Sequence, residues 1–274
     1  MQTLTPSAAA GISLRGISKA FGDGERKVLA LENATLEVER GRFASLVGPS
    51  GCGKSTLLYI LGGFEKASSG TVQALGRPVT GPGIDRGVVF QEYALFPWLT
   101  VSQNIAYGLK TRQLGKAELQ DTVARYLKLM HLEGFGARFP RELSGGMRQR
   151  VALARTFAYQ PDILLLDEPF GALDSQTREL MQDELLRMWQ SSGMTVLMVT
   201  HDLHEAAYLS DDIYVMSKRP GQIVERYASS IDHQLDREEI MLSPQFTELH
   251  NQVWLSVRQQ VKASLSVPAA QEGR

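Results

Sequence analysis

Cysteine is almost missing from this sequence of 274 residues, in which Cys52 stands alone. A single cysteine cannot build a disulfide framework or a cysteine-rich zinc site, and it suits a reducing compartment. A surplus of either charge is missing too, because 29 basic residues face 30 acidic ones and the formal net charge is −1. This balance disfavours binding through broad positive charge, so we expect no nucleic-acid partner.

Long apolar runs are also absent. The purely apolar stretches, such as 163–166 and 196–199, have the length of strands, whereas a membrane-spanning helix takes about 20 mostly apolar residues. Residues 1–10 have neither the charged start nor the apolar stretch of a secretion signal. We therefore expect a cytoplasmic protein whose membrane role, if it has one, depends on partner subunits.

Strand and helix patterns alternate along most of the chain. Turn residues separate 11–21 from 28–38 and 71–75 from 77–79, which predicts two hairpins. Apolar strands then alternate with helical patterns, and these strands cover 43–47, 88–90, 163–166, 195–199 and 213–216. Such alternation predicts an α/β fold with a mostly parallel sheet that is covered on both faces.

Two segments depart from this alternation. From about 101 to 160 apolar residues recur at helical spacing, with a further helix expected over 148–159, so we predict an inserted helical subdomain there. After a core over 12–227, the extension 228–274 is expected to be helical, packed either on its own chain or on a second subunit or regulator. The apolar stripe of this tail is Phe246, Leu249, Val253, Val257 and Val261.

A glycine-rich segment has the spacing of a phosphate-binding loop between a predicted strand and a predicted helix. Its glycines let backbone N–H groups turn towards a phosphate, and the helix adds its positive end. Lys54 would neutralise the β and γ phosphates and Ser55 would hold Mg²⁺, whereas an ordinary glycine-rich turn is the alternative. The candidate binding residues are Gly48, Pro49, Ser50, Gly51, Cys52, Gly53, Lys54, Ser55 and Thr56.

Two adjacent carboxylates, Asp167 and Glu168, directly follow the apolar strand 163–166. Carboxylates at the end of a buried strand are costly unless something compensates for them, as Mg²⁺ and a polarised water would. Asp167 suits the shell of the metal, and Glu168 suits the orientation or deprotonation of an attacking water. A helix N-cap acid beside a solvated one is the alternative.

Two further strands are followed by polar side chains, because Gln91 comes after 88–90 and His201 comes after 195–200. Each residue alone would more often be structural. However, the carboxyl ends of parallel strands meet at one sheet edge, where open α/β folds bind their ligands. We therefore expect one shared site. Its members are Gly48, Gln91, Asp167, Glu168 and His201.

A second anion-binding pattern lies in the helical block, where small residues within 143–147 precede the helix expected from Arg148. A chain with one nucleotide site would not need it. One explanation is that Ser144, Gly145 and Gly146 serve the nucleotide bound to another copy of the chain.

Taken in order, these motifs resemble those of ABC transporter ATPase subunits over roughly 12–227. Residues 143–147 resemble the family signature, which usually ends in Gln where this chain has Met147. We expect little loss from this change, because the Ser144 hydroxyl and the glycine N–H groups contact the phosphate. Gln91 resembles the Q-loop glutamine, and His201 resembles the switch histidine that contacts the γ-phosphate.

The resemblance implies a P-loop NTPase (RecA-like) fold with an N-terminal antiparallel β subdomain and an inserted α-helical subdomain. It implies catalytic roles for Glu168, His201 and Gln91, with ATP and Mg²⁺ as cofactors. Ser55, Gln91 and Asp167 would then contact the metal. Phe21 would stack on adenine, unless it is a core aromatic, and Asp174 would belong to the family's D-loop.

The resemblance also implies a head-to-tail homodimer that sandwiches two ATP molecules, closes with ATP and opens on hydrolysis. Two transmembrane permease subunits would receive this movement, with a periplasmic or extracellular solute-binding protein as an indirect partner. The location would be the cytoplasmic face of the bacterial inner membrane. Residues 93–99 are unusually apolar for a connection, and we expect them to receive a short permease helix, with internal packing as the alternative.

Segments 85–91, 95–101 and 216–221 resemble the importer branch for nitrate, aliphatic sulfonates and taurine, and 81–83 favours taurine. We therefore expect uptake of a small anionic or zwitterionic solute, taurine or an alkanesulfonate, with nitrate or a thiamine-precursor pyrimidine as alternatives. A soluble ABC ATPase of translation or DNA repair is a different class. Such proteins usually carry two cassettes or large insertions, unlike this chain.

Cys52 offers a chemical handle on the phosphate loop. Lys54 and a helix N-terminus lie beside it in the sequence, and both features lower a thiol pKa. We expect alkylation of Cys52 to block turnover and bound ATP to protect it.

Overall fold

The computed structural model of the chain describes residues 10–22, 24 and 27–265. The chain divides into two compact units. The first combines the N-terminal part up to Pro82 with the C-terminal part from Val199 onward, and the second is Gly83–Met198. The second unit is therefore an insertion into the first. It is larger than the helical block predicted over 101–160, because it also contains strands.

An antiparallel sheet opens the first unit, with strands in the order β2-β1-β4-β5. Phe21 pairs with Val28 across one hairpin, and Ala74 pairs with Arg77 across the other, so both predicted hairpins are confirmed. The strands are β1 (Ala10–Phe21), β2 (Val28–Glu39), β4 (Ser69–Ala74) and β5 (Arg77–Pro78).

The first unit also contains β3 (Phe43–Val47), β9 (Asp212–Met216) and β10 (Ile223–Ala228). β9 lies between β3, to which it is parallel, and β10, to which it is antiparallel. Every residue of β3 and β9 is buried, as expected of strands covered on both faces. The helices α1 (Lys54–Gly62) and α6 (Leu203–Leu209) belong to the same unit.

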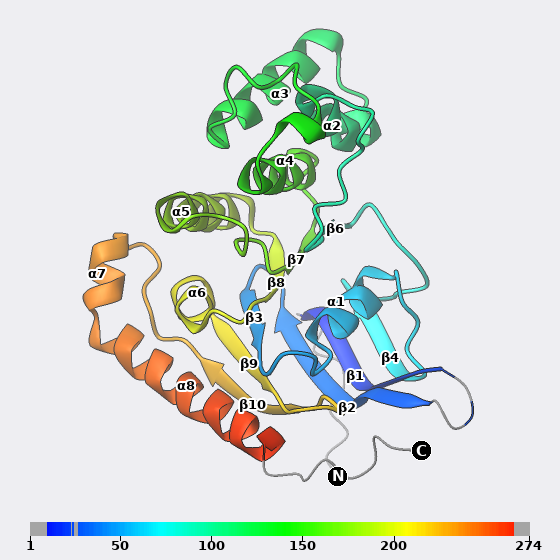
Figure 1. Ribbon diagram of the computed structural model, residues 1–274, viewed down its shortest axis with the longest axis vertical. Helices are drawn as coiled ribbons and strands as arrows, with labels where there is room; N and C mark the ends of the chain where they lie inside the picture. The colour runs from blue at the N-terminus through cyan, green and yellow to red at the C-terminus, as the bar shows by residue number, and fades with distance from the viewer. Residues whose placement is uncertain (1–9, 23, 25–26, 266–274) are drawn as a thin grey trace. The chain divides into compact units, whose positions relative to one another are not determined.

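The C-terminal tail forms α7 (Arg237–Leu242) and α8 (Pro244–Leu265), so the predicted tail helix is confirmed. Figure 1 shows α8 running beside α6 and β9, which it contacts. Phe246, Leu249 and Val253 are buried in this interface. The tail therefore packs on its own chain, which was one of the two alternatives.

The second unit holds β6 (Arg86–Val89), β7 (Ile163–Asp167) and β8 (Thr195–Val199), in the order β8-β7-β6. β6 and β7 are parallel, with Val88 beside Leu165. Its helical elements are α2 (Val101–Leu109), η2 (Lys110–Arg112), α3 (Lys116–Leu129), η3 (Pro140–Glu142), α4 (Gly145–Ala158) and α5 (Ser175–Ser192).

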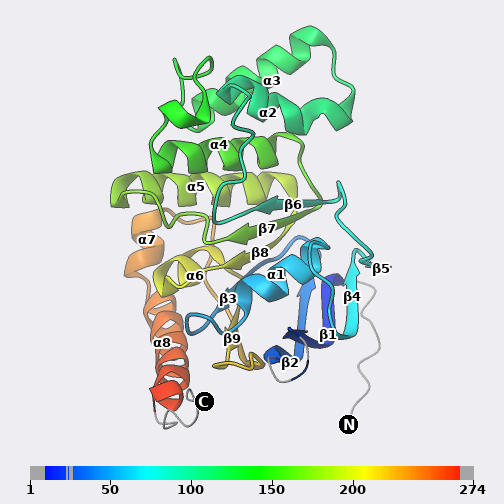
Figure 2. The ribbon, with the colours of Figure 1, turned by 45° about the vertical axis from the view of Figure 1, so that its right-hand side comes forward.

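Figures 1 and 2 both show α4 between α5 on one side and α2 and α3 on the other. Asp174 caps the start of α5, and Gly193, in the left-handed conformation, ends the helix. For α4 the expected start at Arg148 was wrong. Ser144 caps the helix, and this adds Gly145, Gly146 and Met147 to its first turn.

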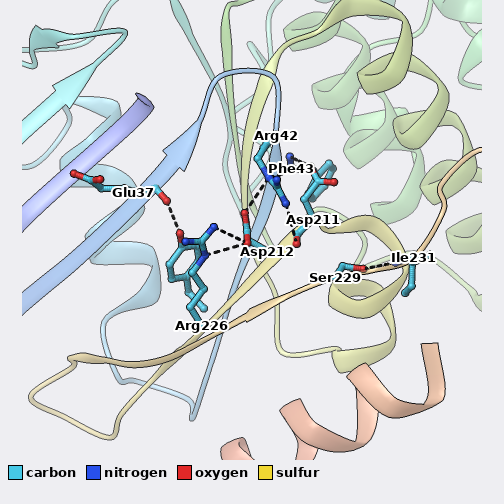
Figure 3. Close-up of polar contacts among 9 residues, drawn as sticks. Glu37, Arg42, Phe43, Asp211, Asp212, Arg226, Ser229 and Ile231 are labelled. Carbon is cyan, nitrogen blue, oxygen red and sulfur yellow. Dashed lines mark hydrogen bonds and ion pairs between the residues drawn. The ribbon is translucent and has the colours of Figure 1, made fainter. Parts of the chain in front are cut away.

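Ion pairs surround a buried carboxylate, Asp212, at the amino end of β9 (Figure 3). Asp212 is 1% exposed; its carboxylate lies 3.1 Å from Nε of Arg42 and 2.9 Å from Nη2 of Arg226. The Tyr214 hydroxyl donates to the backbone carbonyl of Glu37, and burial raises the pKa of Tyr214 to about 12. A buried carboxylate needs such partners, so this cluster ties β2, β3, β9 and β10 together.

Among the helices that the structure describes, none combines the length and the apolar character needed to cross a lipid bilayer.

Candidate functional site

The phosphate loop connects β3 to α1 in the first unit. Gly53 precedes the helix with φ 106°, and a Cβ at this position would lie 2.7 Å from Cδ2 of Leu31. Gly48 follows β3 with φ 154°, and a Cβ there would lie 2.7 Å from the carbonyl oxygen of Met216. Only glycine meets both demands, so the backbone runs in a path that a side chain would block.

Lys54 is held inside this loop and is only 7% exposed. Its Nζ donates to the carbonyl oxygens of Gly48 and Pro49, at 2.9 Å in each case. The cation is thus fixed at the N-terminus of α1, where the helix dipole also favours an anion. Ser55 lies beside it in the first turn of the helix.

The expectation of a lowered thiol pKa at Cys52 was wrong. Burial raises the pKa of its thiol, and the opposing influence of Lys54 is smaller. The side chain is 1% exposed, with Sγ 3.8 Å from Nζ of Lys54. The sequence neighbours do act in the predicted direction, but desolvation of the thiolate is stronger.

Phe21 ends β1 and is exposed, so the alternative reading as a core aromatic is wrong. Nζ of Lys19 lies 4.8 Å from the centre of its ring. An exposed aromatic face beside a cation is able to stack on a base, and the adenine contact stays a prediction.

Asp167 and Glu168 lie where the sequence placed them, at the end of β7 in the second unit. Asp167 is the last residue of the strand and is 1% exposed, whereas Glu168 is half-buried. Glu168 has φ 48°, in the left-handed region. A residue other than glycine held there costs about 1–3 kcal/mol, and such outliers gather at functional sites.

Gln91 and Glu168 come together as expected. Nε2 of Gln91 donates to a carboxylate oxygen of Glu168 at 3.3 Å. The backbone just beyond Gln91 turns through left-handed Tyr93 and Ala94, and Arg155 of α4 donates to both carbonyl oxygens. The segment that carries the glutamine is therefore anchored to α4.

His201 follows β8 on a braced turn of the first unit. The hydroxyl of Thr200 donates to Glu205 at 2.7 Å, and Asp202 caps α6 by accepting from the N–H groups of His204 and Glu205. His201 itself is exposed. The phosphate loop and His201 belong to one unit and Gln91, Asp167 and Glu168 to the other, so the convergence of all five stays a prediction.

The signature residues form the first turn of α4. The Ser144 hydroxyl accepts from the Met147 N–H at 3.2 Å, and Ser144 is exposed. A Cβ on Gly146 would lie 3.1 Å from Cδ2 of Leu173, so this turn packs against the segment that leads to α5. A serine, two small residues and a helix N-terminus can together bind a phosphate presented from outside.

Asp174 caps α5 by accepting from the Thr177 N–H at 3.0 Å. This hydrogen bond lowers the pKa of its carboxyl. Asp174 is exposed and thus able to contact a neighbouring molecule while it caps the helix.

Sequence reasoning missed Gln149, in the middle of α4. It is 3% exposed, and its side-chain amide bonds to the backbone of Glu168 and of Ala172. The only sequence signal was a glutamine among arginines on a helix, which suggests a solvated face.

The donor types fit a nucleotide and a magnesium ion. Mg²⁺ prefers oxygen ligands and is usually bound through one or two carboxylates together with substrate phosphates, so Asp167 and Ser55 suit it. Over the described residues no group of three or more His, Cys, Asp or Glu side chains could form a metal cage of protein alone. A binding mode that shares the metal with phosphates fits this donor set.

The phosphate loop before α1 and the carboxylates after β7 define a P-loop nucleotide hydrolase. Within that class the chain belongs to the ABC transporter family, which it matches over residues 31–171. The predicted fold and the predicted class, an ATP-binding ATPase of this family, are thereby confirmed.

The chain is similar to several import proteins. It is 48% identical over 212 residues to the nitrate import ATP-binding protein NrtD of a Synechocystis species, covering 77% of this chain and 80% of that one. It is 47% identical over 205 residues to the aliphatic sulfonates import ATP-binding protein SsuB of Bacillus subtilis, covering 75% and 79%. For the taurine import ATP-binding protein TauB of Burkholderia pseudomallei the identity is 44% over 238 residues, covering 85% and 92%.

Among solved structures, the dimeric post-hydrolysis state of the ATP-binding cassette MJ0796, bound to ADP and Pi, is similar to this chain. The TM-score is 0.73 at 33% identity, and the match covers 79% of this chain and 98% of that one.

Proposed function

We propose that this chain is the ATP-hydrolysing subunit of a membrane importer for a small anionic or zwitterionic solute. The observation that carries the proposal is the pairing of Gln91 with the left-handed Glu168 at the end of β7, in a chain that also has a glycine-built phosphate loop. A phosphate loop alone would serve many nucleotide-binding proteins. Glu168, by contrast, has a costly backbone conformation and a carboxylate oriented by the amide of Gln91, as a general base for hydrolysis requires.

The residues have distinct roles in this proposal. The loop N–H groups and Lys54 bind the phosphates, and Phe21 stacks on the base. Ser55, Asp167 and Gln91 would hold Mg²⁺, which would supply positive charge to the phosphates. Glu168 accepts a proton from the attacking water, and Gln91 keeps the carboxylate oriented through its 3.3 Å hydrogen bond.

His201 contacts the γ-phosphate. Its braced turn fixes the position from which the ring reaches out, because Thr200 and Asp202 on either side are both hydrogen-bonded into α6. A donor that is preorganised in this way stabilises developing charge without a cost of reorganisation during the reaction.

The exposed Ser144, with Gly145, Gly146 and Asp174, contacts the nucleotide of a second copy of the chain. In such a head-to-tail dimer each ATP needs both copies, so ATP closes the pair and hydrolysis releases it. Closure then moves two permease subunits at the cytoplasmic face of a bacterial inner membrane, and a binding protein outside that membrane delivers the solute.

Residues 93–99 are the proposed contact with the permease. Trp98 is 71% exposed, and Phe96 packs against Trp98 and Tyr107 with ring centres 5.8 and 4.4 Å away. An exposed tryptophan that packs on other aromatic side chains is able to bind an apolar helix. Trp98→Ala should therefore weaken assembly with the permease without changing ATP affinity, and unchanged assembly would refute the contact.

For the solute we propose taurine or an alkanesulfonate. The supporting observation is the resemblance of segments 85–91, 95–101 and 216–221 to the importer branch for nitrate, sulfonates and taurine, together with 81–83, which favours taurine. Nitrate is an alternative, because relatives named for nitrate, sulfonates and taurine are all between 44% and 48% identical to this chain. A thiamine-precursor pyrimidine is the other alternative.

The test is ATPase activity of the chain, reconstituted in proteoliposomes with the permease and binding protein of its own transporter. Taurine, alkanesulfonates, nitrate and pyrimidines are added separately. Stimulation by a sulfonate supports the assignment, and stimulation by nitrate or a pyrimidine alone overturns it. Activity that depends on Glu168 but never on a permease would favour the alternative, a soluble ABC ATPase.

A further inference from the structure

The amide of Gln149 joins two backbone groups on the segment after β7. Its Nε2 donates to the carbonyl oxygen of Glu168 at 3.2 Å, and its Oε1 accepts from the N–H of Ala172 at 3.3 Å. Only this amide orientation satisfies both, because a carbonyl can only accept and an N–H can only donate. Since Gln149 is buried, no solvent takes over these bonds when the side chain is lost.

The carbonyl that Gln149 contacts belongs to the left-handed residue. The same oxygen also accepts from the N–H of Gly171 at 3.3 Å, so Glu168 is restrained on its carbonyl side by two donors. On the carboxylate side it is restrained by Gln91. A conformation outside the favoured region persists only where its surroundings impose it, and these contacts impose it.

Gln149 also lies on the helix that Ser144 begins. In the first turn of that helix Gly146 packs against Leu173, next to Ala172, which Gln149 holds one helical turn further along α4. The start of α4 and the residues after Glu168 are thus fastened to each other at two points.

We propose that Gln149 is a positioning residue for ATP hydrolysis, which fixes the backbone at Glu168 and thereby the place of its carboxylate. The inference rests on the proposed function. It predicts that Gln149 is needed for turnover but not for nucleotide binding or for assembly of two chains, because its amide acts on the backbone at Glu168 and is buried.

The test compares Gln149→Met, which keeps length and removes both hydrogen bonds, with Thr156→Val. Thr156 is also buried in α4, and its hydroxyl donates to the carbonyl oxygen of Ala152 within the same helix. Gln149→Met should lower kcat about tenfold to a hundredfold with KM for ATP within about twofold. Thr156→Val should leave kcat within about twofold, and the two variants should have similar melting temperatures.

A second measurement places Gln149→Met in a Glu168→Gln background and follows ATP-dependent dimerisation by light scattering. Dimerisation that persists supports the proposal, and its loss overturns it, because Gln149 would then act on assembly. An unchanged kcat, or a rise in KM that matches the fall in kcat, also overturns it. Should Gln149→Met not fold, Gln149→Asn, which retracts the amide by one methylene, takes its place with the same expected split between kcat and KM.

Wild-type chain in the same assay separates the two proposals. A Glu168-dependent turnover that is insensitive to Gln149 overturns only the positioning role. Absence of any Glu168-dependent turnover overturns both.

Discussion

The chain begins two helices behind small residues, and the two beginnings differ in construction. α1 starts behind Gly53 and has the buried Lys54 folded into its loop. α4 starts behind the exposed Ser144, whose hydroxyl caps the helix. At the N-terminus of α1 the ammonium group of Lys54 is fixed by backbone carbonyl groups of the same loop, whereas at the N-terminus of α4 the neutral hydroxyl of Ser144 is exposed. This difference agrees with one phosphate site that a chain uses itself and one that it offers to another copy.

The largest effect should come from the α1 side. Lys54→Met removes the cation and its hydrogen bonds to Gly48 and Pro49. We expect ATP affinity to fall at least tenfold and turnover at least about a hundredfold, because Lys54 is the only charged side chain of residues 48–56. Nucleotide-binding fluorescence and phosphate release measure both. Lys66→Met, at an exposed lysine of the same unit, is the control and should change neither.

The α4 side should respond differently. Ser144→Ala should leave ATP affinity unchanged and lower turnover about tenfold, because in the proposed dimer the hydroxyl serves the nucleotide of the partner. Loss of the cap should also cost about 1 kcal/mol of folding free energy. Thr100→Ala removes the comparable cap of α2 and should cost a similar stability without loss of turnover. Equal loss of turnover in both variants would contradict the proposed role.

Mixing the two variants sharpens the comparison. In the proposed head-to-tail dimer of Lys54→Met with Ser144→Ala, one nucleotide site carries both defects and the other carries neither. An equal mixture should regain roughly a quarter of wild-type turnover, since half of its dimers are mixed and each has one intact site. No recovery would mean that Ser144 serves the nucleotide of its own chain.

A smaller effect concerns Cys52, beside Lys54. Because burial raises its pKa, little thiolate forms at neutral pH, and alkylation should be about tenfold slower than for an exposed thiol. The alkylation rate should rise with pH until the pH exceeds the raised pKa of the thiol. Iodoacetamide labelling followed by mass spectrometry at several pH values measures it. Rapid labelling at pH 7 would show that the loop opens.

The smallest effect should come from Met147→Gln, which restores the residue usual in the family signature. The Ser144 cap uses the backbone N–H of Met147 and not its side chain. We therefore expect turnover to stay within about twofold of wild type. A larger gain would show that this side chain takes part in the site.

Most of the fold could be predicted from the sequence, since its signals are local. The two hairpins and the strand that ends at Asp167 follow from short stretches of sequence. The pairing of Gln91 with Glu168 could also be predicted from the sequence, because the carboxyl ends of parallel strands meet at one edge of the sheet.

What sequence reasoning missed depends on contacts between distant residues. The link from Gln149 to Glu168, and the ion pairs from Asp212 to Arg42 and Arg226, need coordinates. Cys52 shows the same limit, since its neighbours in the sequence are visible but its burial is not. The left-handed conformation of Glu168 is imposed by its surroundings and carries no local signal.

That conformation has a consequence for engineering of heat resistance. Glycine adopts a φ of 48° without steric cost, so Glu168→Gly would relax the backbone and raise the melting temperature while removing the proposed proton acceptor. A library selected only for thermostability would therefore be drawn towards inactive chains at this position. Here a robust fold and a working catalyst are competing goals.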